Sequence, residues 1–245
     1  MTLTLLPSAG RVSSSAPDYP PAVPALLAFV AGYVDATTFL AFSGLFVAQT
    51  TGSLVIAGAT INGDAASLVK VAAIPVFFLA GMGTTALVRA FRTDKLDALA
   101  ISLTVEAVLI GGLLLSAIMI PGDGTLGPLF GLAAMGVQSA SARLLLNGYG
   151  STNVMTSNIT QFSIDVEDTL SGLIHRRPVA EPLAGAMRVG GLVLAFFFGV
   201  IAGAIGYRLS GLMGLALMMA TLMGLASWAI SANPLYRRVE DGHGG

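Results

Sequence analysis

Cysteine is absent from this chain of 245 residues, and charged and histidine side chains are few. Without cysteine there is no disulfide, no thiol nucleophile and no thiolate ligand for a metal. The two histidines, His175 and His243, are too few for an imidazole metal centre, so we expect neither a metal nor a cofactor. A formal net charge of -1 supplies no basic field that would attract nucleic acid, so we expect no nucleic-acid partner.

Sequence motifs of several enzyme classes are also missing. The chain contains no phosphate-binding Gly-rich loop ending in Gly-Lys, no Gly-x-Ser-x-Gly nucleophile elbow and no His-Glu-x-x-His zinc pair. ATP-driven transport by this chain alone is therefore not expected. The leading interpretation is that the protein is not an enzyme.

Apolar residues, by contrast, are abundant. They make up 55% of the chain, whereas charged residues make up 10%, which is too little charge to cover a soluble protein of this size. We therefore expect an all-α membrane protein whose main partner is the lipid bilayer. A helix needs about 20 apolar residues to cross a bilayer. Six segments reach that length: residues 22–42, 68–91, 98–120, 126–146, 187–207 and 211–231.

These six segments form one transmembrane domain, residues 22–231, between two polar tails. Residues 1–21 include three consecutive serines and four prolines, which predicts a disordered tail, and residues 232–245 form the second tail. Two shorter polar segments, residues 44–61 and 151–166, lie between spans. If neither crosses the membrane, ten of the twelve Lys and Arg residues lie on one side. Positive charge concentrates on cytoplasmic flanks, so both tails are expected in the cytoplasm.

The order of the segments predicts an internal repeat. Each half, about residues 22–120 and 126–231, contains a span, a short polar segment and two further spans. Because three spans per half is an odd number, the halves would have opposite orientations, which is a 3+3 inverted repeat. The polar segments would be broken or re-entrant helices that enter from opposite faces, although the sequence also allows them to cross.

Four short stretches carry a family resemblance. They are Gly-Tyr-Val-Asp-Ala at 32–36, Gly-Leu-Phe-Val-Ala-Gln-Thr-Thr-Gly-Ser at 44–53, Gly-Val-Gln-Ser-Ala at 136–140 and Thr-Asn-Val-Met-Thr-Ser-Asn at 152–158. Together they resemble the YoaK family of bacterial membrane proteins, also called DUF1275 or UPF0700. The resemblance implies a bacterial inner-membrane protein with about six spans, and it implies no known substrate or reaction. Ser53 and Ser157 depart from the family pattern, which has asparagine and glycine at these positions.

Two carboxyl groups lie deep within predicted spans, where a charged group is costly. Asp35 could be a proton or cation site, or a buried carboxyl that hydrogen-bonds Thr37, Thr38 or a neighbouring helix. Glu106 could be a second station on a proton path, or it could pair with Arg143 or stay neutral. For Arg143 itself, near a helix end, we favour a side chain that extends to the cytoplasmic surface.

Uncharged polar residues of the two short segments form the other candidate site. They are Gln49, Thr50, Thr51 and Ser53 in the first segment, and Thr152, Asn153, Thr156 and Asn158 in the second. Broken helices at membrane depth can bind small solutes through such groups, although they can also simply join helices by hydrogen bonds. Gly199 and Gly203 form a small-xxx-small step, which predicts close helix packing or, alternatively, a homodimer seam.

The leading functional hypothesis is a secondary transporter or permease for a small solute of unknown identity, with proton coupling through Asp35. One alternative is an intramembrane enzyme that uses Asp35 and Glu106 as an acid and a base, which requires the two carboxyls to converge. Another is an assembly or regulatory protein that docks a partner through a cytoplasmic loop at residues 165–181.

Overall fold

The computed structural model describes residues 19–59, 68–90, 95–122, 124–146, 152 and 155–242. All regular structure within these ranges is helical, which confirms the predicted all-α class. The elements are α1 (Ala22–Ala41), α2 (Thr50–Ala59), α3 (Leu68–Ala90), α4 (Lys95–Met119), α5 (Leu126–Leu145), α6 (Met155–Ile174), α7 (Ala180–Ser210), the 3-10 turn η2 (Gly211–Gly214) and α8 (Leu215–Gly242).

Four helical stretches of the described chain are long and apolar enough to cross a membrane: Ala22–Ala41, Val69–Ala90, Lys95–Met119 and Ala180–Ala232. Their burial differs strongly, because 67% of the apolar part of the first stretch is buried inside the protein and only 11% of that of the second. Helix α3 therefore exposes large apolar side chains such as Phe78 and Leu79, which are more than half exposed. Apolar surface of this kind requires lipid around it, and the chain is a multi-pass membrane protein.

Several predicted boundaries differ from the observed ones. The spans predicted at residues 187–207 and 211–231 belong to one helical stretch, Ala180–Ala232, in which η2 separates α7 from α8. Helix α5 begins and ends within one residue of the prediction but is too polar to count among the four apolar stretches. Helix α8 continues to Gly242, so most of the predicted tail from residue 232 is helical. Residues 1–18 of the other predicted tail lie outside the described residues.

The second polar segment is also longer than predicted. Helix α6 is a continuous helix of 20 residues that ends at Ile174, beyond the predicted limit of residue 166. It packs along the first part of α7, and only residues 175–179 between the two helices are not helical. The predicted cytoplasmic loop at residues 165–181 is therefore mainly the tip of a helical hairpin.

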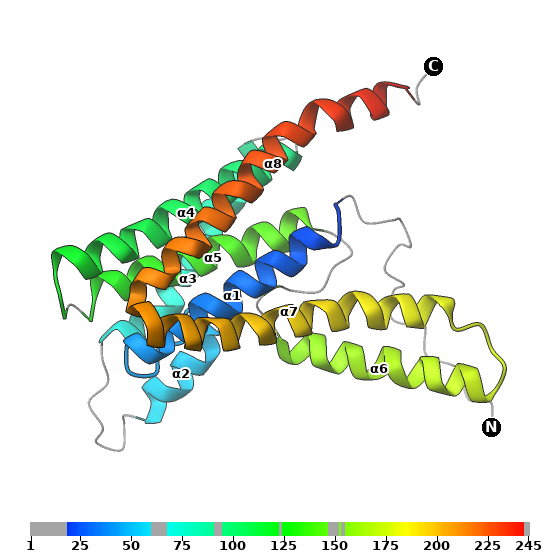
Figure 1. Ribbon diagram of the computed structural model, residues 1–245, viewed down its shortest axis with the longest axis horizontal. Helices are drawn as coiled ribbons and strands as arrows, with labels where there is room; N and C mark the ends of the chain where they lie inside the picture. The colour runs from blue at the N-terminus through cyan, green and yellow to red at the C-terminus, as the bar shows by residue number, and fades with distance from the viewer. Residues whose placement is uncertain are drawn as a thin grey trace, which may run out of the picture.

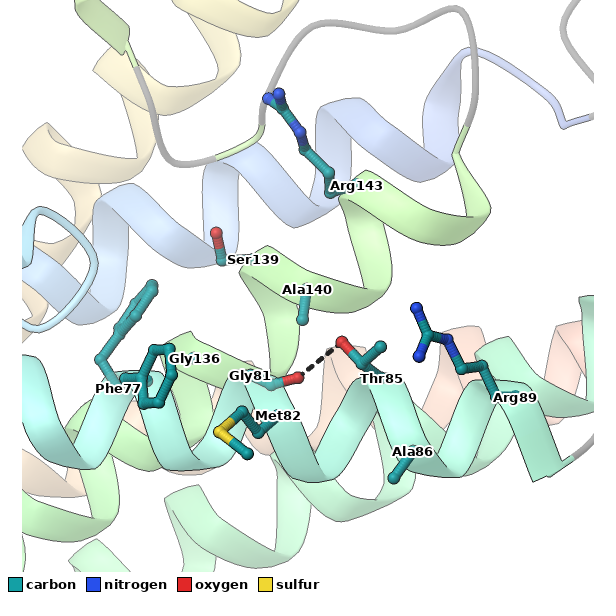
Figure 2. Close-up of a pocket in the computed structure, with 11 residues that line it drawn as sticks. Phe77, Gly81, Met82, Thr85, Ala86, Arg89, Gly136, Ser139, Ala140 and Arg143 are labelled. Atoms are coloured by element: carbon teal, nitrogen blue, oxygen red, sulfur yellow. Dashed lines mark hydrogen bonds between the residues drawn. The ribbon is translucent and has the colours of Figure 1, made fainter.

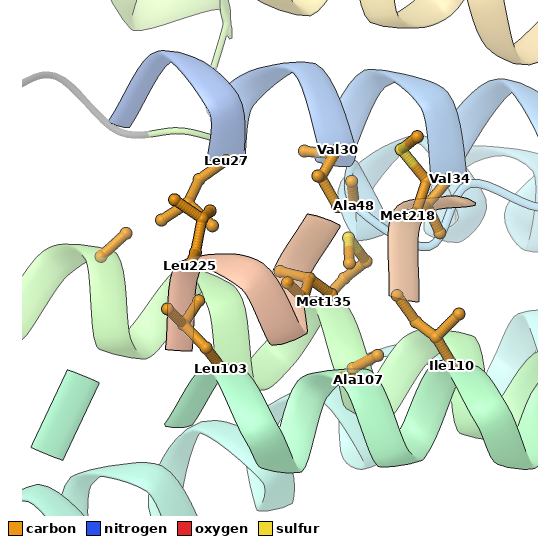
Figure 3. Close-up of a cluster of buried hydrophobic side chains, with 14 of the residues drawn as sticks. Leu27, Val30, Val34, Ala48, Leu103, Ala107, Ile110, Met135, Met218 and Leu225 are labelled. Atoms are coloured by element: carbon orange, nitrogen blue, oxygen red, sulfur yellow. The ribbon is translucent and has the colours of Figure 1, made fainter. Parts of the chain in front are cut away.

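The helices pack in pairs around a common core. Helix α1 packs most extensively on α7, α3 packs on α5, and α4 packs on both α5 and α8, while α2 and α6 lie against α3 and α7. Figure 3 shows the core where α1, α4, α5 and α8 meet, with Leu27, Leu103, Met135 and Leu225 among its members. Figure 1 shows the α4–α5 turn at one end of the molecule and the α6–α7 turn and the end of α8 at the other.

Glycines bring α1 and α7 into backbone contact. A Cβ atom added at Gly203 would lie 2.5 Å from the carbonyl oxygen of Tyr33, and one at Gly199 would clash with the carbonyl oxygen of Phe29. Gly32 on α1 likewise lies against the carbonyl of Phe196. The small-xxx-small step is therefore used for packing inside the chain, as the first reading of the sequence expects, and these two glycines are not free to form a homodimer seam.

Candidate functional site

Asp35 lies in the buried face of α1 and is bonded by backbone amides rather than by side chains. Its Oδ1 atom accepts hydrogen bonds from the backbone N–H groups of Val47 at 2.7 Å and Ala48 at 2.8 Å. The backbone N–H of Gln49 faces the same carboxyl. Thr38 instead donates to carbonyls of its own helix. The carboxyl therefore holds the segment that leads into α2, at the depth of the second half of α1.

The chain reaches Asp35 because it reverses direction directly after α1. Ser43 and Gly44 have positive φ values of 50° and 87°, a conformation that glycine adopts readily and serine rarely. The segment then returns along α1 and buries Val47 completely. Ser53 fixes the return, because its hydroxyl accepts from the backbone N–H of Phe46 at 2.9 Å and donates to the Phe46 carbonyl at 2.8 Å. Although Ser53 departs from the family pattern, it has a defined structural partner.

The predicted polar residues of the first segment are therefore not equivalent. Ser53 is fully buried, Gln49 and Thr50 are partly exposed, and Thr51 is exposed. Those of the second segment divide similarly, with Thr152 and Asn158 buried and Thr156 exposed. Asn153 lies outside the described residues.

Gln138 on α5 is a polar residue of the site that the candidates above omit. Its Nε2 atom donates to the carbonyl of Leu27 on α1 at 2.7 Å and approaches the hydroxyl of Thr152 at 3.4 Å. It thus joins α5 to α1 and to the segment that precedes α6. Its signal in the sequence was the single amide side chain within the span predicted at residues 126–146, and the structure buries that side chain completely.

Glu106 lies at the centre of the buried stripe of α4. Leu99, Leu103, Glu106, Ile110 and Leu113 follow one another at steps of three or four residues, and all are 0% exposed. Neither carboxyl oxygen of Glu106 has a hydrogen-bond partner among the described residues. The alternative pairing with Arg143 is thus absent there, because Arg143 is exposed at the end of α5.

The two carboxyls lie on α1 and α4, which contribute to the same core but are joined mainly through α5 and α8. Helices α1 and α4 make no extended contact with each other, whereas α5 and α8 contact both. An open groove of about 620 Å³ lies elsewhere, between α3 and α5, and is lined by neither Asp35 nor Glu106. Figure 2 shows this groove with Phe77 and Gly136 toward one end and Arg89 and Arg143 toward the other. This groove is therefore not the shared cavity that an acid and base pair of Asp35 and Glu106 would require.

Comparison with known proteins adds one match. A family model described as "Protein of unknown function (DUF1275)" matches residues 23–228, which is most of the chain and extends from α1 to the middle of α8. No curated protein and no solved structure matches the chain. The match covers both carboxyls, both polar segments and the groove, and this multi-pass membrane protein therefore belongs to the DUF1275 family.

Proposed function

We propose that the protein is a secondary transporter for a small neutral or singly charged solute, and that Glu106 is the group through which protons drive transport. The observation that carries this proposal is the position of Glu106. It is fully buried, it lies among apolar residues of a membrane protein, and neither oxygen has a partner among the described residues. An ionisable residue inside a membrane protein is expensive and is most often retained for function.

The chemistry of Glu106 follows from its surroundings. An ionised carboxylate at the centre of a membrane helix costs about 3 kcal/mol on insertion scales, and no hydrogen bond from a described residue reduces that cost here. The neutral acid is the form that a closed interior tolerates. Glu106 would then release its proton only when water reaches it from one side of the membrane, which links protonation to the opening of that side.

Asp35 has a different role in this proposal. Its carboxyl already accepts two short hydrogen bonds from the segment before α2. It therefore positions that segment, whose partly exposed residues Gln49 and Thr50 supply uncharged groups for the solute. The coupling role predicted for Asp35 from the sequence is thus assigned to Glu106.

The packing of the helices supports an inverted repeat of two halves with six crossings. In such a repeat α1 corresponds to α5, α2 to α6 and α3 to α7. The packed pair α1–α7 then corresponds to α5–α3, and the pair α2–α3 corresponds to α6–α7, and both of these counterparts are packed as well. Gly32 of α1 meets the backbone of α7, and Gly136 of α5 meets the backbone of α3. In each half, a buried polar side chain of the first helix contacts the segment before the short helix, Asp35 in one and Gln138 in the other. Repeats of this kind allow access to alternate between the two sides.

Orientation follows from charge. Arg89 and Arg143 lie at the same end of the groove, and Arg176 and Arg177 lie in the α6–α7 turn. When the basic end of the groove and the α6–α7 turn both lie in the cytoplasm, the protein follows the positive-inside rule. The assignment to a bacterial inner membrane, with both tails in the cytoplasm, belongs to this proposal.

The test is solute uptake into proteoliposomes with and without an imposed pH gradient. The panel contains amino acids, sugars, small carboxylic acids and monovalent cations, and the variants are native protein and Glu106→Gln. We expect the gradient to drive accumulation of one solute class by the native protein and not by Glu106→Gln, which retains the shape but has no titratable proton. A matched control is Ser102→Ala, which lies one turn away on α4, is equally buried and bonds only its own helix.

An infrared measurement separates failure of the proposal from failure to find the solute. Protonated carboxylic acids absorb apart from carboxylates, so a pH change should alter a carboxylic acid band that Glu106→Gln removes and Ser102→Ala retains. Absence of any flux across the panel together with an unchanged infrared difference spectrum in Glu106→Gln would contradict the proposal.

A further inference from the structure

The groove between α3 and α5 has an apolar floor and a basic end. Its lining comes from two helices only: Phe77, Phe78, Gly81, Met82, Thr85, Ala86 and Arg89 of α3, and Gly136, Ser139, Ala140 and Arg143 of α5. Small residues create the hollow. At Gly136 the helices touch, since a Cβ there would lie 2.8 Å from the carbonyl oxygen of Phe77. At Gly81 a Cβ would lie 3.9 Å from that of Ala140, so the helices separate toward the basic end.

The length of the groove matches one leaflet of a bilayer. From Phe77 to Arg89 helix α3 rises about 18 Å, which is close to half of a hydrocarbon core of about 30 Å. Phe78 and Met82 are both more than half exposed, so the apolar part opens to the surroundings of the helix bundle. In a membrane these surroundings are acyl chains.

The two arginines at the basic end have no acidic partner among the described residues. Arg89 lies in the last turn of α3 and Arg143 in the last turn of α5, and both are exposed. The groove is lined by no carboxylate, and neither arginine forms an ion pair with a described residue. Figure 2 shows the Arg89 guanidinium at the end of the groove, between α3 and α5, whereas the Arg143 side chain begins at the same end and extends away from α3. The Arg89 guanidinium beside an apolar slot, with the long side chain of Arg143 on the facing helix able to rotate toward it, complements a molecule that has a negative head and a hydrocarbon tail.

We propose that this groove binds an anionic phospholipid, with one acyl chain along Phe78 and Met82 and the phosphate at Arg89 and Arg143. Basic pockets between transmembrane helices on the cytoplasmic side bind acidic headgroups, and each arginine near such a lipid surface contributes about fivefold to affinity. The ligand would bind in a groove that contains neither Glu106 nor Asp35. The site therefore stands independently of the proposed transport function.

The experiment is native mass spectrometry of the full-length protein in detergent, titrated with phosphatidylglycerol, phosphatidylcholine or inorganic phosphate. We expect one phosphatidylglycerol to bind preferentially, and Arg89→Gln/Arg143→Gln to weaken it about 30-fold. Arg208→Gln is the matched control, because Arg208 is also exposed in the last turn of a helix but lies outside the groove. Ala140→Trp tests the apolar part separately, since it fills the slot and keeps both charges.

Each alternative occupant predicts a different result. Equal binding of phosphatidylcholine, or displacement of the lipid by inorganic phosphate, would show that the headgroup or the chain is not recognised as proposed. A double arginine variant that binds phosphatidylglycerol as tightly as native protein would overturn the site. So would a change in oligomeric state of Ala140→Trp without a change in lipid binding, because it would assign the groove to a second copy of the chain.

Discussion

Replacing Gly203 by alanine tests the backbone contact between α1 and α7. The new Cβ would lie 2.5 Å from the Tyr33 carbonyl oxygen and 2.9 Å from the Tyr33 Cα, and ordinary contact begins at 3.4 Å. Because both atoms belong to the backbone, no side-chain rotation relieves the clash, and the helices must separate locally by about 0.9 Å. A gap of that size forfeits roughly a quarter to a half of the dispersion energy of the neighbouring contacts.

Gly191 provides the matched control on the same helix. A Cβ at this exposed position meets nothing within 4 Å, so Gly191→Ala gains only helix propensity, about 1 kcal/mol. Gly203→Ala gains the same propensity but suffers overpacking of about 1–3 kcal/mol, so the difference between the two variants isolates the clash.

The assay is the midpoint of thermal unfolding in one detergent at one scan rate, because unfolding of such proteins is often irreversible. For a chain of this size, we expect the Gly203→Ala midpoint to be on the order of 5 °C below that of Gly191→Ala. Equal midpoints would refute the close approach of α1 and α7. A loss of stability in Gly191→Ala would instead show that this exposed position is covered in the purified protein.

Three further predictions use the same measurement. Asp35→Ala leaves the Val47 and Ala48 amides without their acceptor, at a cost of about 1–3 kcal/mol each, whereas Asp35→Asn keeps an acceptor oxygen and should lose less; equal losses would exclude the amide contacts. Ser53→Ala removes both hydrogen bonds to the Phe46 backbone and should lower the unfolding midpoint, whereas Thr51→Ala, at an exposed position, should not. An unchanged midpoint in Ser53→Ala would contradict the role of Ser53 in fixing the segment before α2. Gly136→Ala should destabilise the α3–α5 contact, and Gly83→Ala, with open space around it, should not; the reverse order would show that α3 packs through its other face.

The class of the fold and the apolar helices could be predicted from composition and segment length alone. Helices α1 and α5 begin and end within about one residue of the predicted limits because apolar residues change to polar ones there. The full length of α6 could not be predicted in this way. The polar composition of this segment does not by itself reveal an amphipathic helix. Within that helix Gln161 donates a hydrogen bond to Asp165, four residues later.

The sequence singles out candidate polar residues but not the contacts that they make. A carboxyl in a transmembrane span singled out both Asp35 and Glu106. Their contacts differ because the turn at Ser43 and Gly44 brings backbone amides to Asp35 and not to Glu106. The groove could not be predicted at all, because Arg89 and Arg143 are 54 positions apart and line one groove only through the packing of α3 on α5.

The interlocked backbones of α1 and α7 have a mechanical consequence. Two helices that touch at glycines along their length cannot slide past one another without lifting apart, and Asp35 ties the start of α2 to the same unit. Helices α1 and α7, together with that segment, should therefore move as one rigid body. Any hinge of the molecule then lies outside this body, at boundaries such as the glycine-containing turn η2, where α7 ends and α8 begins.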